Sequence, residues 1–519
     1  MTILNSPLNY KRNKDFLIAF VVFFCAILTS YADFLYDIAN SDHMPGYASA
    51  NQPMVLNWRD IIAGGRYVSV IIDYIYKLLR YFGVTHYANT YVIQILGMLF
   101  FAAAATLIYS IFLDYINIKN RCNHFVYGLS ILIAFINPFM IETYKFHSFD
   151  FAFGVFFAVT AVFLWSKRKL FLSVLFTVMA FSAYETNIFI ILIMMLFLVL
   201  IQSIEKDVSF KEFLRLQFKS VVICIGMAGL IFAFQRMAIS LINSISNKKS
   251  ISAVKKVDVS FGIDRIWSSV KTALRIVFTC WGMLPKGVLP IFGVIVITII
   301  CIVAKRDKKT IFEFVFVTIL CGVSTFSLLL LGAVYFQRML LSLFFIVALV
   351  CTFLLFILDY YHISESKYKT IVDGIVVFMF MIIFINTQIC ITDAYTAQAI
   401  DIYEAKFIER EIEGYEQESG NIITTIASCG GAGYNSKLGG TYYYPGLLKH
   451  YSFPIPYQRI PYYQWSQGEY INYVNNTDYK CRMMTDEEID SMFNGETEGY
   501  FNPETQLKFK GDTLYWRVY

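Results

Sequence analysis

The sequence predicts a polytopic α-helical membrane protein with a small folded domain at its C-terminal end. Three observations support this prediction. Hydrophobic residues make up 57% of the 519 residues and charged residues only 16%, and the mean hydropathy is +0.56. Apolar runs long enough to cross a hydrocarbon core of about 30 Å recur along most of the chain. The last part of the chain, by contrast, is rich in Tyr, Gly and Asn.

The apolar runs predict about eleven membrane-spanning helices. The fifth run is short, so it and the sixth could form a tight hairpin or one long broken helix. The expected spans cover residues 16–33, 91–113, 124–142, 149–166, 170–184, 186–203, 218–242, 286–304, 311–333, 339–360 and 370–392.

The distribution of lysine and arginine predicts the orientation. When the N-terminus is placed in the cytoplasm, every inner segment carries basic residues, whereas the short outer turns carry only Lys145 and Arg338. Basic loops mark the cytoplasmic side of a membrane. An odd number of spans then puts the C-terminus outside. Basic residues precede the first apolar run and no clear small-residue cleavage site follows it, so we expect a retained signal anchor.

Three large segments then lie outside the membrane: 34–90, 243–285 and 393–519. We expect a transmembrane domain over 1–392, which contains the first two segments, and an extracytoplasmic α+β domain over 393–519. In the latter, "NIITTIASCGG" predicts a strand and turn, and "TDEEIDSMF" predicts a short capped helix. Cys429 and Cys481 could form a disulfide there or remain two free thiols.

Each of the first two outer segments contains an amphipathic helix. Apolar residues share one helical face between Val68 and Phe82, and again between Ile263 and Phe278, with charged residues opposite. Both stretches are too polar to cross a membrane. We therefore expect them to lie flat at the outer membrane–water boundary, an arrangement that is compatible with sideways packing on the helix bundle.

Ionisable and aromatic polar side chains gather at the predicted outer face. Glu142, His147 and Asp150 fall in the expected turn between the third and fourth spans. Tyr184 and Glu185 fall in the next outer turn, and Arg338 begins the tenth span. The first outer segment adds Asp37, Asp42, Arg59, Asp60 and Arg66. Ionisable groups are costly near the hydrocarbon core, so their convergence at one face indicates a functional site.

These residue types suit transfer of a sugar from a lipid-linked phosphate. Arg66, Arg59 or Arg338 could hold the phosphate, because guanidinium matches phosphate geometry. A carboxylate could accept the proton of an attacking hydroxyl. The stretch "CGGAG" lacks the Lys of a nucleotide-binding loop, and no spacing suggests a metal site. The net charge of +5 is small and gives no sign of nucleic-acid binding. We expect no cofactor.

The chain resembles the bacterial membrane glucosyl transferase II proteins, the O-antigen modifying glucosyltransferases that change serotype. The resemblance rests on an Asp after the first span ("NSDHM"), a Trp and a Gly-Arg pair at Trp58 and Gly65-Arg66, the turn "YET", an Arg at the start of a late span, and the ending "CRMMTDEEIDSMF…LYWRVY". Many relatives carry adjacent acidic residues near the first span, whereas Asp37 and Asp42 are separated here. Glu185 stands where Gln is usual.

The resemblance implies a polytopic glycosyltransferase of the GT-C superfamily in a bacterial inner membrane, with its C-terminus in the periplasm. It implies a polyprenyl-phosphate donor such as undecaprenyl-phosphate-glucose and an acceptor such as an O-antigen repeat of lipopolysaccharide. A small flippase and a bactoprenol glucosyltransferase would supply the donor. Asp42, or else Asp37, would be the catalytic base. The candidates for binding substrate are Asp60, His147, Tyr184 and Glu185.

Two other functions stay open from the sequence. A polysaccharide polymerase would also be polytopic and rich in aromatic residues, but its large outer loop would usually lie late among the spans. A transporter of lipid-linked glycans would place charges or broken helices at the bilayer midplane, and paired Gly or Pro breaks are not evident. The soluble segment after the last span favours the transferase.

Overall fold

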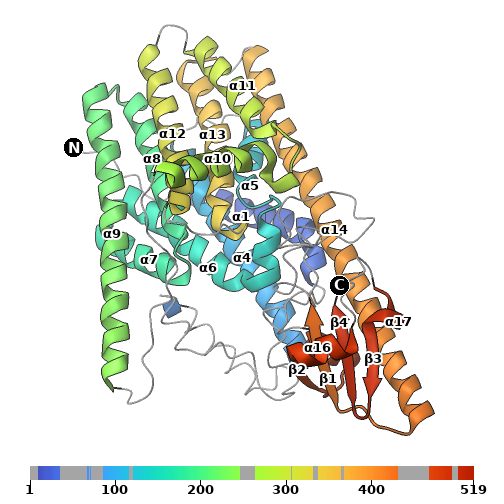
Figure 1. Ribbon diagram of the computed structural model, residues 1–519. Helices are drawn as coiled ribbons and strands as arrows, with labels where there is room; N and C mark the ends of the chain where they lie inside the picture. The colour runs from blue at the N-terminus through green and yellow to red at the C-terminus, as the bar shows by residue number, and fades with distance from the viewer. Residues whose placement is uncertain are drawn as a thin grey trace. The chain divides into compact units, whose positions relative to one another are not determined.

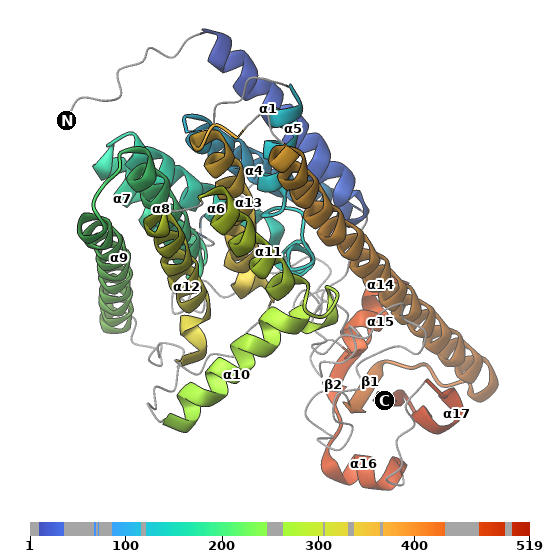
Figure 2. The same cartoon turned by 90° about the horizontal axis from the view of Figure 1, so that it is seen from above.

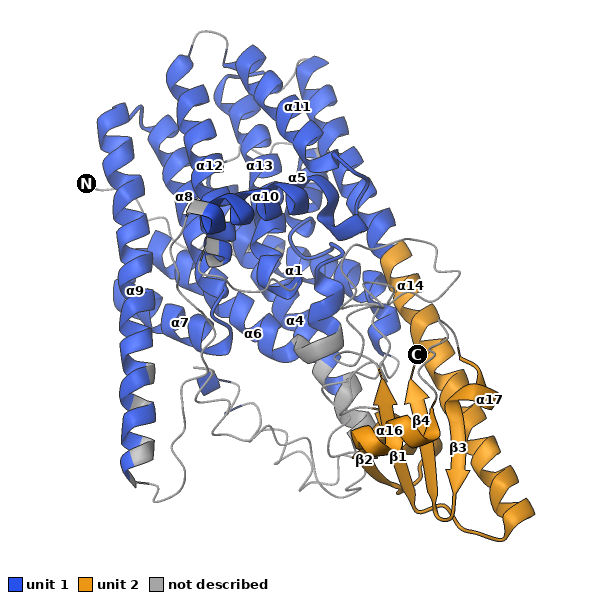
Figure 3. Ribbon diagram, viewed as in Figure 1, with its two compact units in different colours: residues 1–36, 56–388 blue, residues 37–55, 389–519 orange. Residues whose placement is uncertain are grey.

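The computed structural model describes residues 10–35, 67, 68, 71, 86–115, 121–245, 263–304, 307–330, 337–363, 367–430, 467–493 and 501–518. Most of these residues are helical (Figure 1). The chain divides into two compact units (Figure 3). Unit 1 comprises residues 1–36 and 56–388, and unit 2 comprises residues 37–55 and 389–519.

Unit 1 is a helical bundle. Its described elements are α1 (Tyr10–Ser30), η1 (Ala32–Leu35), α4 (His86–Leu113), α5 (Arg121–Leu132), α6 (Met140–Ser166), α7 (Leu170–Ala183), α8 (Asn187–Glu205), α9 (Phe210–Ile245), α10 (Ile263–Thr279), η3 (Cys280–Gly282), α11 (Val288–Val303), α12 (Lys308–Leu330), η4 (Gln337–Leu340), α13 (Leu341–Tyr360) and the first part of α14 (Lys367–Ser419).

Seven helices in the described ranges are long and apolar enough to cross a membrane: α4, α6, α8, α9, α12, α13 and α14. Shorter apolar helices occur in α1, α7 and α11. These elements agree with a polytopic membrane protein, and the expected number of eleven spans stays a prediction. The apolar window of α13 is fully buried and that of α8 mostly so, whereas most of α9 is exposed. Helices α8 and α13 therefore form the centre of the bundle (Figures 1 and 2).

The chain between α5 and α6 departs from the expected spans. The third span was expected to cover 124–142, but α5 ends at Leu132 and α6 begins at Met140. Pro138 lacks a backbone N–H and disfavours helical backbone in the residue before it. The Asn137 side chain donates to the carbonyls of Ile133 and Ala134, at 3.2 and 3.0 Å, which caps the preceding turns. The turn therefore lies at 133–139.

This early turn changes the setting of three predicted outer-face residues. Glu142, His147 and Asp150 were expected in a turn between two spans, and this prediction is wrong, because all three belong to helix α6. The side chain of His147 is outside the described part of the structure. The polar residues from 142 to 150 therefore follow helical spacing along one element.

Helix α10 forms where the second amphipathic helix was expected. It contacts α11 and α12 and runs across the long helices of unit 1 (Figure 1). Ser269 and Ile276 are its buried residues, and the Ser269 hydroxyl donates to the Leu329 carbonyl at 3.0 Å. The large apolar side chains Ile266, Trp267, Val270, Leu274 and Phe278 are exposed. This amphipathic pattern is typical of an interfacial helix. The first predicted amphipathic helix lies outside the described residues except at Val68 and Ile71.

Helix α14 is longer than expected. The last span was predicted to end at residue 392, but α14 continues to Ser419 and contains 53 residues. At about 1.5 Å per residue it is roughly 80 Å long, far more than the ~30 Å that a hydrocarbon core requires. The part of α14 after Gln388 belongs to unit 2, so one continuous helix serves both units.

Unit 2 contains a four-stranded sheet in the order β2-β1-β4-β3. Strand β1 pairs in parallel with β2 and β4, and β3 is antiparallel to β4. One face, which carries Trp516 of β4, packs on residues of α14 and α15, including Ala405, Ile408 and Tyr470. The described elements after α14 are β1 (Thr425–Gly430), α15 (Gln467–Asn475), β2 (Lys480–Met483), α16 (Asp486–Met492), α17 (Pro503–Gln506), β3 (Leu507–Lys510) and β4 (Thr513–Val518).

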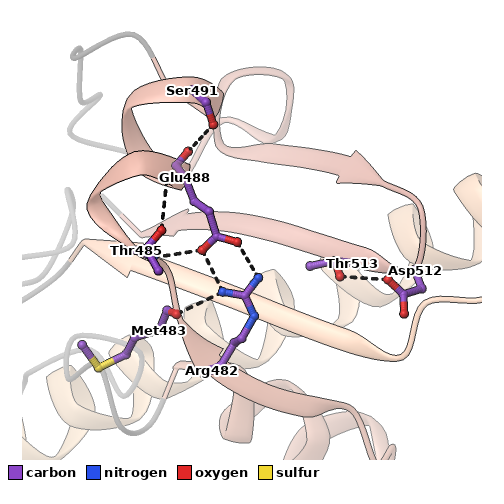
Figure 4. A network of polar contacts seen from close by, with 7 residues as sticks. All are labelled: Arg482, Met483, Thr485, Glu488, Ser491, Asp512 and Thr513. Carbon is purple, nitrogen blue, oxygen red and sulfur yellow. Dashed lines mark hydrogen bonds and ion pairs between the residues drawn. The ribbon is translucent and has the colours of Figure 1, made fainter.

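Helix α16 begins at the predicted cap. The Glu488 backbone N–H donates to the Thr485 hydroxyl, and the Thr485 N–H donates to the Glu488 carboxylate, which makes a capping box. Arg482 donates to both carboxylate oxygens of Glu488, at 2.8 and 2.6 Å (Figure 4). This hydrogen bonding lowers the pKa of Glu488 to about 2. The pair thus fixes α16 to strand β2 at neutral pH.

Cys429 and Cys481 are free thiols. Cys481 lies opposite Ile426 in the parallel register, whereas Cys429 packs with Ala427 and Phe493. Because successive residues of a strand point to opposite faces, Ile426 and Ala427 place the two thiols on different sides of the sheet. Burial raises the pKa of Cys429 to about 11 and that of Cys481 to about 12. Both are therefore protonated at neutral pH.

Gly430 ends β1 in a conformation that other residues rarely adopt. Its φ is +95°, and a Cβ atom placed on it would lie 2.0 Å from the Val518 carbonyl oxygen of β4. The glycines of "CGGAG" thus include one that the sheet requires for close pairing of β1 and β4.

We predict that Gly430→Ala destabilises unit 2 by roughly 2 kcal/mol or more, because left-handed strain and a backbone clash act together. Gly511→Ala is the matched control, since Gly511 also has positive φ (+61°) but no neighbour within 4 Å of a built Cβ. Hydrogen exchange of β1 and β4 amides in the full-length protein should accelerate much more in Gly430→Ala. Equal acceleration in both variants would contradict this assignment.

Candidate active site

The structure describes only part of the predicted site. Arg338, Tyr184 and Glu185 lie in described elements of unit 1. Outside the described residues are Asp37, Asp42, Arg59, Asp60 and Arg66, and the side chain of His147. The roles assigned to all of these residues stay predictions. The part of the site that the structure describes is therefore the region of the bundle around Arg338.

Arg338 is paired with Glu142, from an element that lies far away in the sequence. The Arg338 guanidinium nitrogen Nη1 lies 2.6 Å from Glu142 Oε1. The Arg338 backbone N–H donates to the other carboxylate oxygen, Oε2, at 2.7 Å. Both oxygens of Glu142 are thus bound by one residue of η4. The carboxylate is fully buried, and the arginine side chain is 18% exposed.

The pair joins helix α6 to the start of helix α13. Glu142 lies in the first turn of α6, and Arg338 lies in η4, the single turn that leads into α13. A buried carboxylate is tolerated only when it is paired and hydrogen-bonded. The side chain of Gln337, next to Arg338, is also fully buried. Neither polar atom of its amide has a hydrogen-bond partner within the described structure.

Aromatic residues enclose the element that carries Glu142. The Phe139 ring, just before α6, packs on Trp281 and Phe344 with ring centroids 5.2 and 4.9 Å apart. Trp281 is held in place by an unusual backbone, because Cys280, Trp281 and Gly282 all have positive φ. Such strain in non-glycine residues costs of order 1–3 kcal/mol each and persists only where packing enforces it.

A tyrosine from α1 fixes the turn before α6. The Tyr31 hydroxyl donates to the Asn137 carbonyl and accepts from the Asn137 N–H, both at 3.0 Å. The neighbouring ring of Tyr144 lies 4.4 Å away between centroids. The Tyr144 hydroxyl is buried and has no hydrogen-bond partner within the described residues. Apart from the Asn-Pro step, no feature of the sequence indicated these contacts.

Tyr184 and Glu185 form the turn between α7 and α8, as expected. The Tyr184 ring is buried against Phe151 of α6, with centroids 4.5 Å apart, and Glu185 is half-buried. Gly154 of α6 lies close to the first residue of α8, since a Cβ on it would lie 2.3 Å from Asn187 Nδ2. The packing of Tyr184 explains its burial without a substrate, and its predicted binding role is untested.

The described residues offer no set of metal ligands. No group of three or more His, Cys, Asp or Glu side chains is arranged to hold a metal ion in the described ranges. The group of the described arrangement whose side-chain type recognises anions is the guanidinium of Arg338, which is paired here with Glu142.

We predict that Tyr31→Phe lowers the free energy of unfolding by roughly 1–3 kcal/mol, because it leaves the buried Asn137 N–H without its acceptor. Tyr144→Phe is the matched control and should change stability by less than about 0.5 kcal/mol, because its hydroxyl has no partner to lose. Thermal unfolding of both variants in detergent measures the difference. Equal losses would show that the Tyr31–Asn137 bonds do not anchor the turn.

Comparison with known proteins identifies the family. The family model described as "Glucosyl transferase GtrII" matches residues 49–387. The matched range includes Arg59, Asp60, Arg66 and Arg338 and begins after Asp37 and Asp42. No curated protein and no solved structure matched the chain. Because the match covers more than half of the 519 residues, the chain belongs to the glucosyl transferase GtrII family, as its resemblance to glucosyl transferase II proteins predicted.

Proposed function

We propose that this protein transfers glucose from a polyprenyl-phosphate donor to an O-antigen or another surface polysaccharide at the periplasmic face of a bacterial inner membrane. The observation that carries the proposal is the GtrII family match over residues 49–387. The apolar helices of unit 1 support it, because a lipid-linked donor requires a site beside the bilayer. The paired guanidinium of Arg338 supplies a suitable group for the donor phosphate.

The proposed reaction is a single displacement at the anomeric carbon. An acceptor hydroxyl oxygen attacks this carbon, the bond between the carbon and the phosphate oxygen breaks, and polyprenyl phosphate leaves with the bonding electrons. A carboxylate accepts the hydroxyl proton as the new bond forms. Asp42 is the first choice for this base and Asp37 the reserve. Arg338, Arg66 and Arg59 are the candidates that stabilise the leaving phosphate.

Other proposed contacts complete the site. Asp60, His147, Tyr184 and Glu185 are the candidates that bind the sugar or the acceptor. The exposed apolar residues of α10 would rest in the outer leaflet beside the donor. The donor would reach this face through a small flippase after synthesis by a bactoprenol glucosyltransferase, and unit 2 would lie in the periplasm.

We predict that Asp42→Asn lowers glucose transfer by roughly 10²–10⁴-fold, because the amide keeps the shape and removes the base. Purified full-length protein would be assayed with radiolabelled undecaprenyl-phosphate-glucose and an O-antigen acceptor. Asp264→Asn, in the first turn of α10, is the control and should retain wild-type transfer. Loss of activity in Asp37→Asn alone would make Asp37 the base.

If neither aspartate matters while wild-type protein transfers glucose, the base lies elsewhere. If the wild-type protein extends a polysaccharide by whole repeats, it is a polymerase and not a transferase. If it only moves lipid-linked glycan across a vesicle membrane, it is a transporter.

A further inference from the structure

The side-chain amide of Gln337 is buried without a hydrogen bond. The residue is fully buried, and neither Oε1 nor Nε2 has a partner within the described structure. Three other buried glutamines differ from it, because Gln94, Gln217 and Gln467 each donate through Nε2 to a backbone carbonyl, at 2.8, 3.1 and 3.2 Å. A buried polar side chain that lacks every partner calls for an explanation, such as an ordered water or a ligand.

The backbone fixes the place of this amide. Gln337 opens η4, and the backbone N–H of the next residue, Arg338, donates to the Glu142 carboxylate at 2.7 Å. That bond anchors the turn to the start of α6. A buried amide that makes no hydrogen bond costs the desolvation of its polar groups, which an apolar side chain of the same size would avoid. The chain therefore carries an amide where an apolar residue would be more stable, as is typical of binding groups.

The turn that carries Gln337 lies close to the accessible surface of the bundle. The Arg338 side chain is 18% exposed, and Met339 is half-buried. A ligand that reaches this turn is thus one residue away from the amide. Ligand pockets enclose most of the ligand's surface and use a few polar groups on their walls to fix its orientation. A fully buried amide beside accessible side chains suits such a wall.

The chemistry of the amide selects a ligand that carries hydroxyl groups. A carboxamide has N–H donors on Nε2 and an acceptor at Oε1, and it carries no charge. An anion would use only the donors, and a cation would use only the acceptor. A hydroxyl group can donate to Oε1 or accept from Nε2, so neighbouring hydroxyls of a sugar can satisfy both atoms of Gln337 at once.

We propose that Gln337 binds sugar hydroxyl groups of a substrate and contributes to the selection of that sugar. The inference rests on the proposed function, which supplies two sources of such hydroxyls, the glucosyl group of the lipid-linked donor and the acceptor glycan. A sugar that lacks the matching hydroxyl is rejected, because it leaves the buried amide unpaired.

Gln337→Met tests the proposal, because methionine has a similar length and volume and removes both polar atoms of the amide. We expect kcat/KM for glucose transfer by the full-length protein to fall roughly 10–100-fold, the loss that corresponds to two hydrogen bonds. The Tm in detergent should stay unchanged or rise, because the variant no longer buries an amide without a partner.

Gln217→Met is the matched control. Gln217 is also buried, but its amide donates to the Leu196 carbonyl. Its replacement should not raise the Tm, and it should leave kcat/KM unchanged.

Two titrations identify the source of the hydroxyls. In one, undecaprenyl-phosphate-glucose is replaced by its monodeoxy analogues, and in the other the acceptor glycan is varied. If Gln337 binds the donor sugar, wild type and Gln337→Met should transfer one deoxy sugar equally well, because the hydroxyl that the amide binds is already missing. If Gln337 binds the acceptor, the loss should appear in the acceptor KM and be the same for every donor.

The outcomes separate hydroxyl binding from a structural role and from the proposed function. An unchanged kcat/KM in Gln337→Met would overturn the proposal while glucose transfer stands. A large fall in Tm together with transfer that is equally poor for every donor and every acceptor concentration would also overturn it. If Gln337→Met does not accumulate, the preference of Gln337→Ala among the donors decides, because that ratio does not depend on the amount of folded protein. Absence of transfer by the wild-type protein would overturn the proposed function, and the role of Gln337 with it.

Discussion

A buried carboxylate in an apolar bundle constrains the arrangement of unit 1. Glu142 has no solvent to stabilise its charge, so the chain must supply partners, and it supplies both from Arg338. The bond crosses 196 residues of sequence and holds the first turn of α6 at the turn that precedes α13, the most buried long helix. Removing either partner would leave a charge buried alone, which is far more costly than never having the pair.

Several neighbouring features follow from this requirement. Helix α6 has to begin before Glu142, and the Asn137-Pro138 step ends the preceding turns early enough to allow it. Tyr31 then fixes the Asn137 backbone, and Phe139 packs against Trp281 on its strained turn. Glu142, the Asn-Pro turn and the aromatic enclosure thus form one continuous set of contacts that ends at Arg338.

Long-range apolar periodicity predicted most of the helices, since length and hydropathy are local properties of the sequence. The capped helix at Thr485 and the strand at Thr425–Gly430 were also predictable from short signals. The pairing of Glu142 with Arg338 was not, because spacing along the chain does not report which helices meet. Glu142 was predicted to lie in a turn. It lies in a helix instead, because the chain turns earlier, at the Asn137-Pro138 step, and α6 begins several residues before the expected start of the fourth span. The sequence also left open whether Cys429 and Cys481 pair. They lie on opposite faces of the sheet, which depends on how the strands pair.

The family assignment carries the proposed chemistry. Family membership indicates glucosyl transfer, and the proposed function assigns the guanidinium of Arg338, which is paired with Glu142, to the phosphate of the donor. Mass analysis of surface polysaccharide from cells with and without the protein, in a strain that makes the lipid-linked glucose donor, tests the central claim most directly. The account predicts added glucose on the polysaccharide only when the protein is present. An identical polysaccharide mass in both strains, with the protein stably in the membrane, would contradict it.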